Sequence, residues 1–236
     1  MSTDNRLTRE LDCVLHLLDR QVVDVEGLMV CKVDDVELVE NPDGELVVTG
    51  LLAGPAALVP RFGGGLGRRT LAYWHRLGSE QADRTRPYRI ALDDVERLES
   101  AVELRVQRDG ALVRQQPQRG GLRRRRLNEL LQMTVYGDHG AELGGVLDVR
   151  LAPAGDTEAG EPVAVTGMIV GKGRPGSLLG YDRGPDQGPL LVNRAVRFLH
   201  RHSGLVGIDD VAEIDWESDR ITLRRRDLDE LRPVGQ

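Results

Sequence analysis

The sequence predicts a mainly β protein built from two copies of one small β-barrel unit. Three observations support this prediction: the length of the chain, short apolar segments separated by turns that contain glycine and proline, and segments that recur in the same order. The 236 residues suffice for two domains of roughly 100 to 120 residues each. A duplication is therefore the first organisation to consider.

The repeat is clearest around two glycine turns, where Gly27 in the first half corresponds to Gly140 in the second. The matching segments are 22–38 with 135–151, 48–54 with 165–171, and 93–95 with 209–211. Their common order predicts a first repeat over residues 1–113 and a second over 127–236, joined by an arginine-rich linker over 114–126.

Each copy is predicted to begin with a leucine-bearing lead-in, a short strand, a glycine turn and a second strand. In that second strand Val33 and Val36, or Val146 and Val149, are expected to face the interior, and their separation of three residues requires a bulge or bend. An apolar run follows in each copy, over 46–52 and 163–170, and is short and branched enough to form a buried strand.

The later part of each copy is predicted to contain a glycine-rich loop, a short inserted helix, a turn and further strands. We expect the helices over 68–77 and 190–202, because their apolar residues recur on one side. Asp93 and Asp209 are expected to form turns or caps before a short helical turn. The last strands are expected over 99–106 and 220–223.

Composition excludes several classes of protein. The net charge of -6 and the pI near 5.5 disfavour a general nucleic-acid binder, which carries a broad positive excess. Two cysteines are too few for a disulfide framework, and no apolar run approaches the ~20 residues of a membrane span. The N-terminal residues lack the apolar core of a signal peptide, so we expect a cytoplasmic protein.

Residues 17–27 and 33–38 resemble the opening of PRC-barrel domains, in which a leucine lead-in and a strand to Asp-x-x-Gly precede Gly-x-Val-x-Asp-Val. The second copy, over residues 130–151, resembles this pattern more closely because it keeps glycines directly before Val146. The first copy has Cys31 and Lys32 there, which puts the geometry of that turn in question.

The resemblance covers most of both copies except the inserted helices and the linker, and implies tandem SH3-like barrels that contact other proteins. PRC-barrel domains occur in the H subunit of photosynthetic reaction centres, in a ribosome-maturation factor, and in actinobacterial proteins, some linked to magnesium transporters. The resemblance implies no catalytic residues.

The motifs of enzymes and metal sites do not occur in the sequence. His200 and His202 are two residues apart, which does not suit a metal pair on one face of a helix, and no cysteine pair accompanies them. The glycine-rich segments 63–67 and 171–176 match neither the phosphate loop nor the dinucleotide pattern. We expect a non-catalytic protein without cofactor or metal.

The segment 105–126, which ends with the linker, carries the highest local density of charge, and two interpretations of it stay open. Its arginines could bind an anionic partner, or they could cover carboxylates elsewhere on this acidic chain. The candidate binding residues are Arg123, Arg124, Arg125, Arg126, Trp74, Arg76, Arg197 and Arg201.

Three functions compete. A protein-interaction scaffold or adaptor is preferred. The alternatives are a regulatory protein peripheral to the inner membrane or bound to a membrane transporter, and an RNA- or ribosome-associated assembly factor.

Overall fold

The computed structural model describes residues 7, 10–62, 86–98, 101–118, 123–153, 162–171, 203–226 and 228–230. These residues are mainly β-strand, as the sequence predicts. The chain divides into two compact units: unit 1 comprises residues 1–128 and 151–165, and unit 2 comprises residues 129–150 and 166–236. The units therefore differ in their bounds from the predicted repeats. The helices predicted over 68–77 and 190–202 lie outside the described residues.

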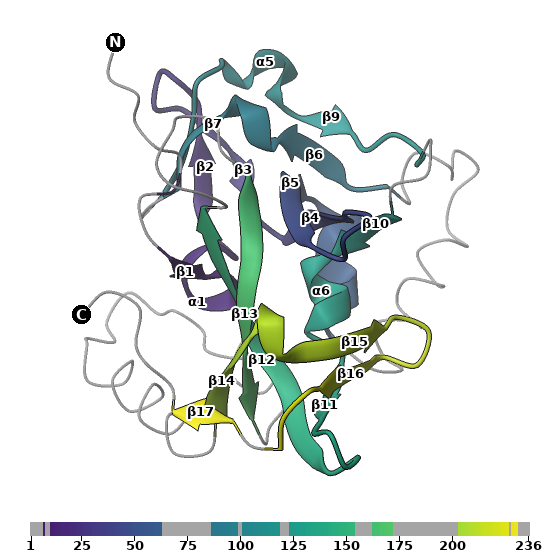
Figure 1. Cartoon of the computed structure of the whole chain (residues 1–236). Helices are drawn as coiled ribbons and strands as arrows, with labels where there is room; N and C mark the ends of the chain where they lie inside the picture. The colour runs from purple at the N-terminus through teal and green to yellow at the C-terminus, as the bar shows by residue number, and fades with distance from the viewer. Residues whose placement is uncertain are drawn as a thin grey trace. The chain divides into compact units, whose positions relative to one another are not determined.

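Unit 1 contains two sheets with short connecting helices. Its elements are β1 (Leu11–Asp12), α1 (Cys13–His16), β2 (Gln21–Val23), β3 (Met29–Lys32), β4 (Asp35–Glu40), β5 (Leu46–Ala53), α2 (Pro55–Leu58), η1 (Val59–Phe62), β6 (Tyr88–Ala91), η2 (Leu92–Asp94), β7 (Val95–Leu98), β8 (Val102–Leu104), α5 (Arg108–Ala111), β9 (Val113–Arg114) and β10 (Arg123–Arg126). One sheet has the order β3-β2-β8-β7. In the other, β10 pairs with β4 and β4 with β5, while β6 pairs with β5 and β9 with β6 (Figure 1).

Strand β4 is buried on both faces, and this arrangement creates the polar site described below. Because side chains alternate along a strand, Val36 and Leu38 occupy one face, and Asp35 and Glu37 occupy the other. All four side chains are almost fully buried. The opposing strand β5 carries Gly50, where a Cβ atom would lie 2.8 Å from the carbonyl oxygen of Ile90. Glycine therefore lets β6 pair closely with β5.

Unit 2 is built around two long strands. Its elements are β11 (Thr134–Tyr136), most of β12 (Glu142–Pro153) and of β13 (Val163–Gly171), β14 (Ser203–Gly207), η3 (Ile208–Asp210), β15 (Val211–Asp215), β16 (Arg220–Leu223) and β17 (Asp229–Glu230). The short helix α6 (Leu127–Leu130) begins in unit 1, to which Asn128 belongs, and ends in unit 2. The strand order is β15-β16-β11-β12-β13, with β14 on β13 and β17 on β14. Strand β16 confirms the strand predicted over 220–223, whereas β8 is shorter than the strand predicted over 99–106.

The hydrogen bonds around β2 recur around β11. Strand β2 pairs antiparallel with β3 and parallel with β8, and β11 pairs antiparallel with β12 and parallel with β16. Gly27 and Gly140 both have a φ angle of 77° and each donates its N–H to the residue three positions before it. The valines predicted to face the interior, Val33, Val36, Val146 and Val149, are all fully buried.

The two aligned segments differ just after the position at which the first has Cys31 and the second has Gly144. In the second half one strand, β12, runs through this position, whereas in the first half β3 and β4 are separate strands. Gly144 has a φ angle of 144°, and a Cβ atom there would overlap the carbonyl of Gly171. Glycine therefore permits the continuous strand. Among the described strands of each unit, the first and last strands of a sheet do not pair with each other. The closed barrels therefore stay a prediction.

Candidate functional site

Four of the linker arginines, Arg123–Arg126, form strand β10, and three of their side chains bind groups within unit 1. Strand β10 pairs antiparallel with β4, in the register that places Arg125 opposite Leu38. The Arg124 Nη1 donates to the carbonyl oxygen of Gln116 at 2.7 Å. The Arg126 Nη1 donates to the carbonyl oxygen of Ala56 at 3.1 Å.

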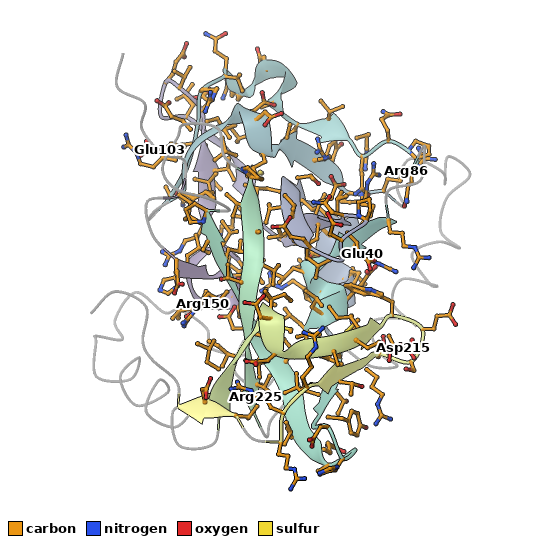
Figure 2. The ribbon with its side chains drawn as sticks, viewed as in Figure 1. Glu40, Arg86, Glu103, Arg150, Asp215 and Arg225 are labelled. Atoms are coloured by element: carbon orange, nitrogen blue, oxygen red, sulfur yellow. The ribbon has the colours of Figure 1, made fainter. Side chains whose placement is uncertain are left out.

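Two of these arginines also pair with carboxylates of β4. The Arg124 Nε lies 3.2 Å from Glu37 Oε2. The Arg125 Nε lies 3.7 Å from the Oε2 of Glu40, which is labelled in Figure 2. The geometry fits the interpretation in which these arginines cover carboxylates of the chain. The side chain of Arg123 is exposed. Trp74, Arg76, Arg197 and Arg201 lie outside the described residues.

Glu37 is the centre of a buried polar cluster. Its Oε1 accepts hydrogen bonds from Arg89 Nε at 2.6 Å and from Thr49 Oγ1 at 2.9 Å. Its Oε2 accepts a hydrogen bond from Gln115 Nε2 at 2.6 Å and faces Arg124. The donors come from β5, β6, β10 and the segment after β9. One carboxylate thus joins four parts of unit 1.

The electrostatics of this cluster favour the ionised carboxylate. Burial raises the pKa of Glu37, but the hydrogen bonds from Gln115 and Arg89, with the charge of Arg89, outweigh it and hold the pKa below its ordinary value. Glu37 is therefore ionised at neutral pH. Because its partners are already supplied by the chain, this carboxylate is a structural group and a poor general acid or base.

Three of the six large hydrophobic side chains that are exposed among the described residues lie on the hairpin between β2 and β3, and the other three, Leu15, Tyr88 and Val113, lie elsewhere in unit 1. Val25, Leu28 and Met29 lie within five consecutive residues and have exposed fractions of 56%, 43% and 52%. A turn of this kind normally carries polar side chains, because its residues face water. We call Val25, Leu28 and Met29 the apolar hairpin. Sequence analysis missed it, although the signal was present as apolar residues on both sides of Gly27.

The apolar hairpin is held in a fixed conformation by Asp24. The Asp24 Oδ1 accepts the backbone N–H groups of Glu26 and Leu28, both at 2.9 Å, and Oδ2 accepts that of Arg108 at 3.1 Å. Burial raises the pKa of Asp24, but these three hydrogen bonds outweigh it, so the pKa lies below its ordinary value. The hairpin is therefore tied to the start of α5 by an ionised carboxylate.

The described side chains that could bind a metal ion or act as a nucleophile do not form a cluster. Among the described residues no group of three or more His, Cys, Asp or Glu side chains is placed to hold a metal ion. Burial and the nearby Asp34 raise the pKa of the Cys31 thiol to about 11, so it stays protonated at neutral pH. In the part of the chain that the structure describes, no helix is long and apolar enough to cross a membrane.

Comparison with known proteins leaves the family open. No protein-family model matches the chain, and no curated protein matches it.

Proposed function

We propose that the chain is a non-catalytic protein-interaction scaffold, made of two PRC-barrel-like repeats, that binds its partner through the apolar hairpin. The observation that carries the proposal is the exposure of Val25, Leu28 and Met29 on one turn that Asp24 holds in place. Each apolar side chain contributes about 1.5 to 3 kcal/mol when it is fully buried against a partner. A fixed turn also loses little conformational entropy on binding, which favours affinity.

The proposal of two repeats rests on matched local geometry. The N–H of Val33 donates to the carbonyl of Arg20, and the N–H of Val146 donates to that of Met133, in both cases across thirteen residues. Asp35 and Asp148 each accept the N–H of the following valine, at 2.8 and 2.7 Å. The short 3-10 helices η2 and η3 also follow equivalent strands. Such agreement at equivalent positions favours a duplicated ancestor.

The state of the linker arginines favours a protein partner over an anionic one. Arg124, Arg125 and Arg126 have carboxylates or backbone carbonyls of the chain as partners. Binding to RNA phosphates or anionic lipid would have to displace these contacts, and the chain as a whole repels polyanions because its net charge is -6.

Affinity capture from the source cells tests the proposal. The tagged wild-type chain and its Arg123→Ser variant are compared at low and at high salt, and the captured material is identified by mass spectrometry. We expect one dominant protein, retained by the variant and at high salt, because apolar contacts are insensitive to ionic screening. Capture of RNA or lipid that is lost in high salt would support the alternatives instead.

A further inference from the structure

The side chain of Asp35 is a second buried carboxylate in β4, and its environment is unlike that of Glu37. Asp35 is 1% exposed. Its Oδ1 accepts the backbone N–H of Val36 at 2.8 Å and that of Asn128 at 3.1 Å. Its Oδ2 is buried without a hydrogen-bond partner. One oxygen of this carboxyl group thus has hydrogen-bond donors, and the other has none.

The satisfied oxygen connects two segments that are far apart in the sequence. Asn128 lies in the first turn of α6, directly after β10, and Asp35 is the first residue of β4. The first N–H groups of a helix have no partner within the helix, so Asp35 supplies an acceptor there from another strand. The carboxyl of Asp35 therefore fixes the junction of β10 and α6 to β4.

The charged groups near Asp35 do not compensate fully for its burial. Arg126 of β10 and Arg61 of η1 favour the ionised form, but Arg61 forms a two-pronged ion pair with Asp19, at 2.9 and 3.2 Å. Arg126 donates to the carbonyl of Ala56. The neighbouring carboxylates on β4 are Asp34, whose Oδ2 accepts the N–H of Gly54, and Glu37, which its own cluster satisfies.

We propose that Asp35 is a pH-responsive latch: its neutral form keeps the β10–α6 junction on β4, and its ionisation loosens that junction. The physical reason is the buried Oδ2, because a negative charge there has no donor and is relieved when the junction opens to water. Burial raises the pKa of Asp35 to about 7, against the lowering effects of Val36, Arg126, Asn128 and Arg61. The latch therefore titrates in the range in which cells change pH.

The sign follows from linkage. The closed junction binds a proton more tightly than the open one, since the pKa is higher when Asp35 is buried. Opening is thus hardest below the ordinary pKa of 3.8 and becomes easier as the pH rises through about 7. The latch therefore opens more readily when the pH rises.

Amide hydrogen exchange of the full-length chain tests the latch. Protection factors of the amides of residues 123–128 are measured at about pH 5.5 and about pH 8.5 and corrected for the intrinsic rate. We expect protection to fall about 30-fold, the ratio that follows from a pKa of 3.8 in the open state and about 7 in the closed state. In the Asp35→Asn variant protection should be the same at both values of pH.

Two controls keep the test decisive. Asp43→Asn removes an exposed carboxyl from the turn between β4 and β5, and should leave the pH response of residues 123–128 intact. If Asp35→Asn fails to fold, the carboxyl carbon of Asp35 is titrated by NMR in the wild-type chain. A midpoint below about 5, or protection that is equal at both values of pH in the wild type, overturns the proposal.

Discussion

The Nε of Arg124 lies 3.2 Å from the Oε2 of Glu37, and this ion pair joins the predicted linker to strand β4 of unit 1. Arg124 belongs to β10, the strand that leads into α6, and Glu37 belongs to the centre of β4. The carboxylate is buried, whereas the guanidinium is partly exposed. The linker is therefore a strand of unit 1 as well as a connection.

Replacement of Glu37 by glutamine should destabilise unit 1 by about 2 to 4 kcal/mol, because it leaves the partly buried Arg89 and Arg124 without a counter-charge. Chemical denaturation measures the change in the free energy of unfolding. The control is Glu45→Gln, because the Glu45 carboxylate is exposed and accepts a hydrogen bond from the Asn41 amide; this change should alter stability by less than about 0.5 kcal/mol. Equal effects of both variants would contradict the central role of Glu37.

Replacement of Asp35 by asparagine should stabilise the protein at alkaline pH. Asparagine keeps an oxygen for Val36 and Asn128 and carries no charge. The folded state holds the proton of Asp35 more tightly than the unfolded state, so wild-type stability declines as the pH rises from about 4 to about 7.

The free energy of unfolding of the variant should therefore exceed that of the wild type by up to about 4 kcal/mol at pH 8. This difference should vanish towards pH 4. Denaturation at both values of pH measures it. A variant that is less stable at both would show that the ionised carboxylate stabilises the fold.

Replacement of Gly144 by alanine should cost about 2 to 4 kcal/mol, because the added Cβ overlaps the carbonyl of Gly171 and the backbone has a positive φ angle. Gly44→Ala is the matched control: its φ angle is 83°, but a Cβ atom there meets open space. We expect about 1 kcal/mol for the control. A similar cost at both sites would mean that conformation, and not the contact with Gly171, requires the glycine.

Replacement of Asp24 by alanine should release the apolar hairpin, since three backbone N–H groups lose their acceptor. Faster amide exchange at Glu26, Leu28 and Arg108 is the expected result. Asp24→Asn keeps one acceptor oxygen for Glu26 and Leu28, and should preserve most of the protection at these two positions. Unchanged exchange in the alanine variant would show that other contacts hold the turn.

Much of the fold could be predicted from the sequence, because apolar periodicity indicates strands and glycine-containing segments indicate turns. The runs at 46–52 and 163–170 became β5 and β13, and the glycine turns at Gly27 and Gly140 have matching geometry. The break between β3 and β4 was not predicted, and it comes two residues after Cys31, which aligns with Gly144 of the continuous strand β12, where φ is 144°.

Less of the candidate site could be predicted, because the sequence shows which residues are charged but not which residues they contact in the folded chain. The linker arginines were identified as candidates, yet their carboxylates, Glu37 and Glu40, lie over eighty residues earlier. The apolar residues Val25, Leu28 and Met29 are visible in the sequence beside Gly27, but their exposure depends on tertiary packing, which a pattern of five residues does not determine.

The most direct test of the scaffold proposal replaces the apolar hairpin. A chain that carries Val25→Ser, Leu28→Ser and Met29→Ser is compared with the wild type for binding to the protein that affinity capture identifies, with both chains first shown to unfold at similar denaturant concentrations. We expect the dissociation constant to rise at least about 100-fold, since about 3 kcal/mol or more of apolar contact is lost. An unchanged dissociation constant, or a wild-type chain that captures no protein, would contradict the proposal.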